Sequence, residues 1–273
     1  MDKFYVIANS GKDKDGAVSK GIANYIRSKG KICILEEEGS LTEDVDCILV
    51  LGGDGTLLRA ARELVYHKIP LLGINLGTLG YLAEIDRNSI FPALDKLFAD
   101  EYTIESRMML KGTVYHEGKE VFSDIALNDV VIVREGPLRV VKFKNYVNGA
   151  FLNEYQADGI IVSTATGSTG YSLSVGGPIV SPETSILLMT PIAPHTLNTR
   201  SVIFPGEDKI MVEIGPGRMG QQDAAAANFD GETTRSMETG DYIVIEKANQ
   251  KTNLVKINNI SFLETLRTKM RDS

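Results

Sequence analysis

The sequence predicts an α/β N-terminal domain built on a parallel sheet, followed by a mostly β C-terminal domain. Over the first hundred residues, short apolar runs alternate with segments of helical spacing. This alternation is typical of parallel strands joined by right-handed crossovers. After Glu105, short strand-like runs follow one another with few intervening helices, which is typical of a β domain. A chain of 273 residues is long enough for two domains with a core each.

The first domain takes its elements from the alternation of apolar runs and helical segments. We expect strands at Phe4–Ala8, Ile32–Leu35, Ile48–Leu51 and Pro70–Asn75, and helices at Asp15–Lys29, Thr56–His67 and Ser89–Phe98. The tail Phe262–Met270 is amphipathic, and we expect it to form a helix that returns to this domain. Residues 1–105, completed by 253–273, are therefore assigned to one Rossmann-like α/β domain that binds nucleotide or phosphate.

The second domain, residues 106–252, is predicted from short strand-like runs. These runs are Met109–Tyr115, Ile125–Val133, Val140–Val147, Gly159–Thr164, Ser185–Thr190, Ser201–Phe204, Lys209–Ile214 and Tyr242–Lys247. The segment Arg218–Asn228 contains Gln-Gln-Asp and four alanines, and we expect it to be a surface loop.

Composition excludes several classes of function. A net charge of −7 argues against sequence-independent nucleic-acid binding, which needs clustered Lys and Arg. Cys33 and Cys47 both lie in apolar runs, so we expect two buried thiols rather than a disulfide or a metal site. The chain enters a strand at once and has no apolar run of about 18 residues, so we expect neither a signal peptide nor a membrane span. These observations together predict a cytoplasmic protein.

The glycine turn Gly52-Gly53-Asp54-Gly55-Thr56 lies where the apolar strand ending at Leu51 meets a helical segment. Exposed backbone N–H groups and a helix N-terminus at such a point bind phosphate. A carboxylate there would repel phosphate unless it takes a proton from a hydroxyl or holds a metal, so the turn indicates phosphoryl transfer. The alternative is ordinary turn chemistry, with Asp54 as a helix cap. Arg59, about one turn later, either reaches the same phosphates or is a solvated residue of the helix surface.

Two further glycine-rich segments accompany this turn. Gly73–Tyr81 follows the next strand, and it is expected to face the glycine turn across one crevice. The segment Ser163–Ser174 holds seven Ser or Thr residues in twelve. Short hydroxyls suit the donors and acceptors of a sugar or a base, and Tyr171 could stack on a ring. The alternative is a long connecting loop whose Ser and Thr side chains bond to their own backbone.

Four motifs then occur together, in the order Gly52–Thr56, Asn128–Asp129, Asp158–Gly177 and Thr190–Leu197. In this order, and over nearly the whole chain, they resemble the NAD kinases. The first motif alone is shared with lipid kinases and phosphofructokinases, whereas the four together are highly specific. The resemblance implies transfer of the ATP γ-phosphoryl group to the 2′-hydroxyl of the adenosine ribose of NAD, giving NADP.

The resemblance also implies roles for individual residues. Asp54 matches the general base, Asn128 the residue that contacts adenine, and Asp129 the one that holds a ribose hydroxyl, where the family more often has Glu. Asp158 matches a carboxylate near the nicotinamide. The implied cofactor-binding set comprises Gly52, Gly53, Gly55, Thr56, Arg59, Asn128, Asp129, Arg139, Asp158, Thr166, Thr169, Gly170, Tyr171, Ser172, Leu173, Ser174 and Ala193. Arg139 could equally be an exposed strand residue, and no metal ligand is assigned.

The implied partners are small molecules, with ATP as donor, NAD as acceptor and a divalent cation such as Mg²⁺. Ala193 resembles a cofactor contact supplied by a neighbouring subunit, which implies a homodimer or homotetramer with the NAD site near a subunit interface. Neither nucleic acid nor membrane is expected as a partner.

Two other functions compete with this interpretation. A lipid kinase would share the glycine turn but would not explain residues 158–177. A catalytically silent NAD(P)-binding regulator would keep the pocket without turnover, and Asp54 disfavours it because binding alone gains nothing from a carboxylate facing phosphate.

Overall fold

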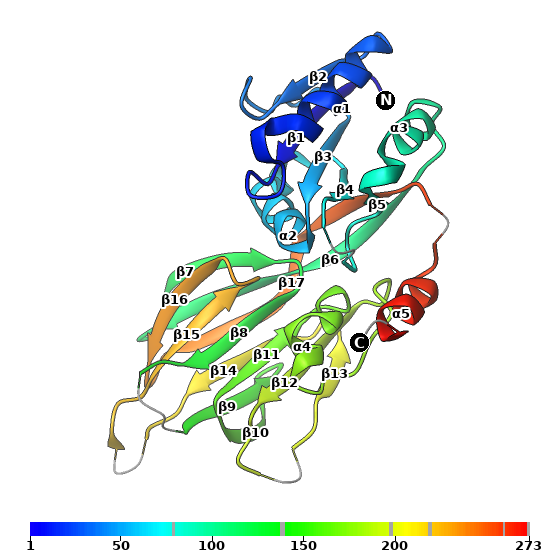
Figure 1. Cartoon of the computed structure of the whole chain (residues 1–273). Coiled ribbons are helices and arrows are strands. Elements are labelled where there is room, and N and C mark those ends of the chain that lie inside the picture. Colours follow the sequence, from blue (N-terminus) through cyan, green and yellow to red (C-terminus); the bar gives the residue numbers. More distant parts are fainter. Residues whose placement is uncertain (78–79, 137–139, 197–198, 218–219, 259, 272–273) are drawn as a thin grey trace. The chain divides into compact units, whose positions relative to one another are not determined.

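The computed structural model describes residues 1–77, 80–136, 140–196, 199–217, 220–258 and 260–271 (Figure 1). The chain divides into two compact units. The first unit is Met1–Arg107 with Lys251–Ser273, and the second is Met108–Gln250.

The first unit is built on a parallel sheet, as the alternation of strand and helix predicts. Its central strands are β1 (Lys3–Ala8), β2 (Ile32–Leu35), β3 (Cys47–Gly52) and β4 (Leu71–Asn75), in the order β4-β3-β1-β2. The short strand β5 (Ile85–Asp86) pairs in parallel with β4, and so does β17 (Tyr242–Lys256), through Leu254 opposite Leu71. Every residue of β3 is buried, which explains its uninterrupted apolar run.

Three α-helices of the first unit lie between or after these strands: α1 (Ala17–Ser28), α2 (Asp54–Glu63) and α3 (Ile90–Phe98). Short 3₁₀ turns adjoin them at Lys14–Gly16 (η1), Val65–His67 (η2) and Arg87–Ser89 (η3). Helices α1 and α3 bury Ile22, Ile26, Leu94 and Leu97 in the same apolar cluster as Phe4.

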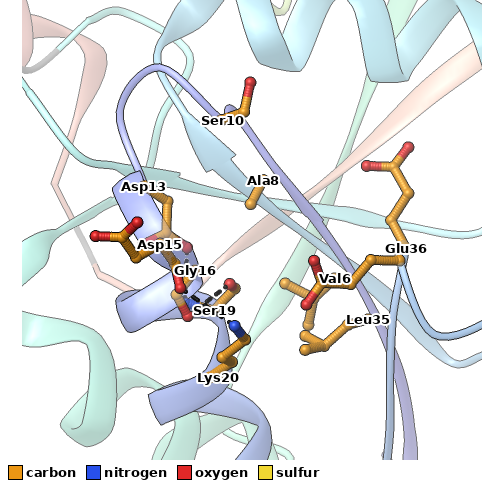
Figure 2. A pocket seen from close by; sticks show the side chains of 11 residues that line it. Val6, Ala8, Ser10, Asp13, Asp15, Gly16, Ser19, Lys20, Leu35 and Glu36 are labelled. Atoms are coloured by element: carbon orange, nitrogen blue, oxygen red, sulfur yellow. Dashed lines mark hydrogen bonds between the residues drawn. The ribbon is translucent and has the colours of Figure 1, made fainter.

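The expected bounds of two helices need correction. Helix α1 begins at Ala17 because Asp15 and Gly16 have left-handed φ angles of 62° and 64°. The Asp13 carboxylate then accepts hydrogen bonds from Val18 N and Ser19 N, both at 2.9 Å, in the first turn of α1. Asp13 and Ser19 are drawn in Figure 2. Helix α2 begins two residues earlier than expected and ends at Glu63, so the predicted helix Thr56–His67 is an α-helix followed by a separate 3₁₀ turn.

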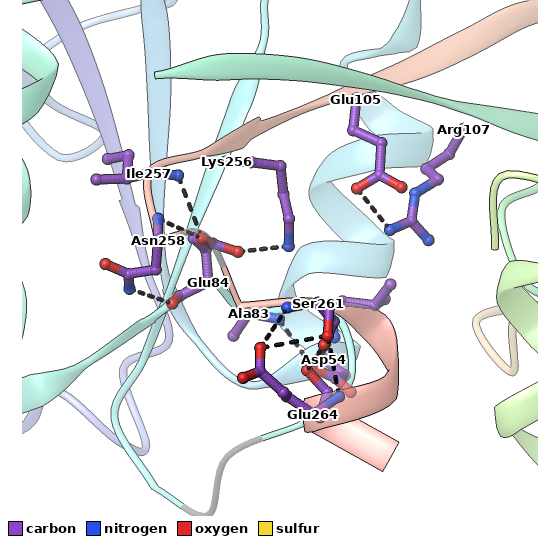
Figure 3. Close-up of polar contacts among 12 residues, drawn as sticks. Asp54, Ala83, Glu84, Glu105, Arg107, Lys256, Ile257, Asn258, Ser261 and Glu264 are labelled. Carbon is purple, nitrogen blue, oxygen red and sulfur yellow. Dashed lines mark hydrogen bonds and ion pairs between the residues drawn. The ribbon is translucent and has the colours of Figure 1, made fainter. Parts of the chain in front are cut away.

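The C-terminal helix α5 (Phe262–Arg271) belongs to the first unit, as predicted. Ser261 and Glu264 form a capping box, in which Ser261 N donates to Glu264 Oε2 and Glu264 N donates to Ser261 Oγ. The preceding chain is held by Glu84, which accepts from Ile257 N and Asn258 N and forms an ion pair with Lys256 (Figure 3).

The second unit consists of antiparallel strands, as predicted. One sheet has the order β13-β12-β11-β8-β15-β16, and the strands β10-β9-β14-β17 form a second layer. The hairpin of β6 and β7 pairs with β17. The bounds are β6 (Thr103–His116), β7 (Lys119–Ala126), β8 (Asp129–Arg134), β9 (Val141–Val147), β10 (Ala150–Ala157), β11 (Gly159–Ser163), β12 (Ile186–Ile192), β13 (Val202–Pro205), β14 (Ile210–Ile214), β15 (Ala224–Phe229) and β16 (Thr233–Glu238). Side chains from both layers, including Phe143 and Phe229, share one core.

Two sequence expectations for the second unit are wrong. The alanines 224–227 lie in β15, an inner strand between β8 and β16, rather than in a surface loop. The predicted strand Ile125–Val133 is interrupted, because the Asp230 carboxylate accepts the N–H groups of Leu127, Asn128 and Asp129. Leu127 and Asn128 therefore belong to neither β7 nor β8.

Candidate functional site

The glycine turn of the first unit holds Asp54 at the start of α2. Gly53 is the N-cap residue, with no side-chain cap, so Asp54 does not cap this helix. Its carboxylate instead accepts backbone N–H groups from Tyr81 at 2.7 Å, Leu82 at 3.2 Å and Ala83 at 3.4 Å. The second glycine-rich segment therefore meets the glycine turn through Asp54 (Figure 3).

The glycines of this region differ in the space that a side chain would have. A Cβ on Gly80 would lie 2.0 Å from Asp54 Oδ1, and a Cβ on Gly52 would lie 2.3 Å from Thr56 Oγ1. A Cβ on Gly53 would lie 2.6 Å from Lys12 Nζ, whereas one on Gly55 would have no neighbour within 4 Å. Gly52 and Gly80 thus allow close packing, while the exposed backbone of Gly55 is open to a ligand.

Two side chains of α2 complete this half of the predicted site. Thr56 is buried, and its Oγ1 accepts from Asn9 Nδ2 at 3.3 Å. Arg59 is exposed, one turn into the helix, and forms no hydrogen bond or ion pair with any residue that the structure describes. Its guanidinium is therefore available to an anion near the turn.

In the second unit the structure brings Asn128, Asp129 and Gly170 together. A Cβ on Gly170 would lie 3.4 Å from Asn128 Nδ2 and 3.7 Å from Asp129 Oδ2. Asn128 Oδ1 is buried and has no hydrogen-bond partner among the described residues. An unpaired buried acceptor of this kind costs free energy, so it points to a donor supplied by a ligand.

Asp129 is an unusual carboxyl group. It is 6% exposed, and burial, followed by the charge of Asp230, raises the pKa of Asp129 from its usual value of 3.8 to about 7. The Asp129 side chain thus gains or loses its proton near neutral pH. Asp230 lies in the turn Asp230-Gly231-Glu232, which resembles a late Asp-Gly turn of the family, but the sequence did not predict its contact with this segment. Asp230 both orders residues 127–129 and perturbs Asp129.

The hydroxyl-rich segment after β11 folds into a 3₁₀ turn, Thr166–Thr169 (η4), and a short helix, Tyr171–Ser174 (α4). Several of its hydroxyls have partners within the protein. Thr164 Oγ1 donates to Leu127 O at 2.7 Å, Ser168 Oγ donates to Ala165 O at 2.7 Å, and Ser172 Oγ lies 3.0 Å from Thr190 Oγ1. Thr169 Oγ1 donates to Thr166 O at 3.3 Å.

The remaining candidates of this segment differ in accessibility. Thr166 is buried, Leu173 is half-buried, and Tyr171 and Ser174 are exposed. Tyr171 is 44% exposed, and an exposed aromatic ring is suited to stacking on a planar ligand. Arg139 lies outside the described residues.

Asp158 lies at the start of β11, beside the end of β8. Its Oδ1 accepts from Arg134 Nε at 2.7 Å, an ion pair that sequence reasoning missed. The pairing of Gly159 with Val133 places the two charges on neighbouring strands, and local sequence does not specify this pairing. Asp158 N also donates to Ile192 O, and the next residue, Ala193, is exposed with a φ of 44°.

A separate cavity of about 380 Å³ lies in the first unit beside the ends of β1 and β2 (Figure 2). Its lining includes the carboxylates of Asp13, Asp15, Glu36 and Glu37, against one cationic side chain, Lys20. This lining disfavours phosphate. No helix in the described part of the chain is long and apolar enough to cross a membrane.

Comparison with known proteins identifies the family. The family model for the ATP-NAD kinase N-terminal domain matches residues 22–102, and that for the ATP-NAD kinase C-terminal domain matches residues 127–257. The NAD kinase of Lachnospira eligens is 47% identical, covering 99% of this chain and 100% of that protein. The NAD kinase of Agathobacter rectalis is 46% identical, covering 99% of each chain.

Solved structures agree with this result. An NAD kinase from Archaeoglobus fulgidus in complex with ATP has a TM-score of 0.80 at 26% identity, covering 99% of both chains. A yeast NADH kinase complexed with NADH has a TM-score of 0.88 at 22% identity, covering 99% of this chain and 88% of that one, which shows a common fold. This chain belongs to the NAD kinase family, whose members phosphorylate NAD.

Proposed function

We propose that this chain transfers the γ-phosphoryl group of ATP to the 2′-hydroxyl of the adenosine ribose of NAD, forming NADP and ADP, with Asp54 as general base. The observation that carries the proposal is the Asp54 carboxylate, which the N–H groups of Tyr81, Leu82 and Ala83 orient at a glycine turn. A positioned base next to open phosphate-binding backbone is the arrangement that this reaction needs.

The proposed reaction exchanges one P–O bond for another. The 2′-hydroxyl oxygen forms a bond to the γ-phosphorus while its proton passes to an Asp54 carboxylate oxygen. The bond from the γ-phosphorus to the β–γ bridging oxygen breaks, and ADP leaves with that electron pair. Gly55, whose backbone is exposed, and Arg59, whose guanidinium has no partner in the described structure, stabilise charge on the phosphates.

A divalent cation fits this site as part of the bound ATP. The described residues contain no group of three His, Cys, Asp or Glu side chains placed to hold a metal ion. Mg²⁺ commonly binds through one or two carboxylates together with substrate phosphates, so a turn with Asp54 as its one carboxylate suits it. When bound, the cation neutralises negative charge on the phosphates.

The second unit supplies the groups for NAD. Asn128 Oδ1, buried without a partner in the described structure, suits the amino group of adenine. Asp129 suits a ribose hydroxyl, and Tyr171 is exposed for stacking. We assign Asp158, held by Arg134, to the nicotinamide end. The Glu common in the family at position 129 is longer by one methylene, so Asp129 reaches less far.

The turn after β12 bears on the oligomeric state. Ala193 directly follows β12, is exposed, and has a left-handed backbone conformation with a φ of 44°. We assign this turn to the cofactor site of a neighbouring subunit in a homodimer or homotetramer. We also assign the protein to the cytoplasm.

The test is an endpoint assay of the purified protein with ATP, Mg²⁺ and NAD, using an NADP-specific dehydrogenase to detect the product. Asp54→Asn should lower kcat by about 10²- to 10⁴-fold, the usual contribution of a general base. Its dissociation constant for NAD should stay within about twofold of wild type, because a general base acts in the transition state rather than in binding.

Asp86→Asn is the matched control, because Asp86 is also a carboxylate that accepts a backbone N–H, from Asn88, but lies at η3. It should keep wild-type activity. Retained turnover in Asp54→Asn would refute the general-base role, and NAD binding without product in the wild type would favour the silent regulator.

A further inference from the structure

Lys12 lies over the glycine turn, although no sequence motif singled it out. The Lys12 ammonium would be 2.6 Å from a Cβ on Gly53 and 3.5 Å from a Cβ on Gly77. Two glycine-rich segments, one after β3 and one after β4, thus leave room for the same cation. A larger side chain at Gly53 would displace it.

The loop that carries Lys12 is fixed to the glycine turn by hydrogen bonds. Asn9 N donates to Leu51 O at 2.8 Å, and Asn9 Nδ2 donates to Thr56 Oγ1 at 3.3 Å. Within the loop, Lys12 N donates to Asn9 O at 2.9 Å, and Gly11 N donates to Asn9 Oδ1 at 3.0 Å. Asn9 therefore sets the position of the Lys12 backbone relative to Gly53.

The ammonium of Lys12 has no hydrogen-bond or ion-pair partner among the residues that the structure describes, Asp54 included. The carboxylate-lined cavity next to this loop would repel phosphate, although Ser10 and Asp13 on either side of Lys12 line it. An anion that reaches this end of the sheet is therefore directed to the side where Lys12, Gly53 and Gly55 lie.

We propose that Lys12 binds the polyphosphate of the donor, with its ammonium donating to phosphate oxygens over Gly53 and Gly77. This inference rests on the proposed phosphoryl transfer and adds a residue to it. Lys12 acts as a mobile point charge, which suits a group whose charge shifts as the terminal phosphoryl group leaves. The expected ligand chemistry is a triphosphate chain, whatever nucleoside carries it.

The experiment compares Lys12→Met, Lys12→Arg and Lys14→Met with the wild type. Lys14 is an exposed lysine two positions away in η1 and serves as the matched control. Lys12→Met should raise KM for ATP, or lower kcat/KM for ATP, by about 10- to 100-fold, the scale of one lost charge-assisted hydrogen bond. KM for NAD should change by less than about twofold, since NAD contacts other residues.

A second readout is calorimetric titration of each variant with inorganic tripolyphosphate. Lys12→Met should bind it about tenfold more weakly, Lys12→Arg should recover most of the affinity, and Lys14→Met should match wild type. Equal thermal stability of the three variants would exclude a merely structural role.

The outcomes separate the two proposals. If the wild type forms NADP but Lys12→Met uses ATP and binds tripolyphosphate as the wild type does, the role of Lys12 is refuted and the proposed function stands. If the wild type forms no NADP, the proposed function fails. The binding of tripolyphosphate then tests by itself whether Lys12 binds a polyphosphate chain. Weaker binding by Lys12→Met supports the inference, and equal binding overturns it.

Discussion

The glycine turn of the first unit and the hydroxyl-rich segment of the second unit look equally suited to ligands in sequence, but they differ in structure. At the glycine turn, Gly55 is open, and Lys12 and Arg59 have no partners in the described chain. In residues 163–174, the hydroxyls of Ser168 and Ser172 are buried and already bonded to other residues. A buried hydroxyl needs a partner, so a dense run of Ser and Thr reports internal packing as much as ligand binding.

The largest expected effect is a loss of stability on substitution of Gly167, which lies in the hydroxyl-rich segment. A Cβ there would lie 2.1 Å from the Asn128 carbonyl oxygen, which is rigid backbone. Gly167→Ala should therefore lower the free energy of unfolding by about 3 kcal/mol or more, because overpacking of a buried site is costly. Urea unfolding followed by circular dichroism measures this change.

Gly55→Ala is the control from the other region. A Cβ at Gly55 meets nothing within 4 Å, so this variant should be as stable as wild type or up to about 1 kcal/mol more stable. It should nevertheless use ATP less well, because the methyl group occupies space proposed for phosphate. Equal loss of stability in both variants would erase the distinction between the two regions.

The parts of the fold that were predictable are those with strong periodicity. Strands such as β1 and β3 are nearly continuous apolar runs, and their parallel pairing followed from the helices between them. Strand β15 was missed because alanine has a low strand propensity and little hydrophobic signal. It is a strand because the small side chains of Ala225 and Ala227 fit the crowded core beside Phe229.

Candidate site residues could be named from the sequence only where they stand in short motifs, as Asp54 and Asn128 do. The structure holds the Asp54 carboxylate by backbone N–H groups and buries Asn128 Oδ1 without a partner among the described residues, and the roles of both stay predictions. Asp230, Arg134 and Lys12 act on residues between 24 and 103 positions away in sequence. Such contacts depend on strand pairing, which local periodicity does not specify.

A smaller effect, on the pH dependence of stability, is expected at Asp129 in the second unit. Its pKa of about 7 means that the folded protein holds this proton more tightly than the unfolded chain, whose value is near 3.8. The resulting stability is fully present below about pH 4 and is lost as the pH rises through 7. Asp129→Asn cannot ionise at this position. Its free energy of unfolding, relative to that of the wild type, should therefore rise by about 1–3 kcal/mol from pH 5 to pH 8.

Urea unfolding of both proteins at pH 5, 6, 7 and 8 measures this difference. Other carboxyl groups titrate in both proteins and cancel in the comparison. If the difference in free energy of unfolding between the two proteins stays constant over this range, Asp129 is ionised throughout. The raised pKa of Asp129, attributed to burial and Asp230, would then be wrong.

The smallest effect separates a structural hydroxyl from an exposed one within the same helix. Ser172 Oγ is buried and lies 3.0 Å from Thr190 Oγ1, which itself donates to Ser201 Oγ at 3.1 Å. Ser172→Ala should cost about 1 kcal/mol of stability, the net value of one buried hydrogen bond. Ser174→Ala, at an exposed position of α4, should change stability by less than about 0.5 kcal/mol. If Ser172→Ala instead kept full stability and raised KM for NAD, the hydroxyl would serve the ligand, and the two regions would be more alike than their hydrogen bonds indicate.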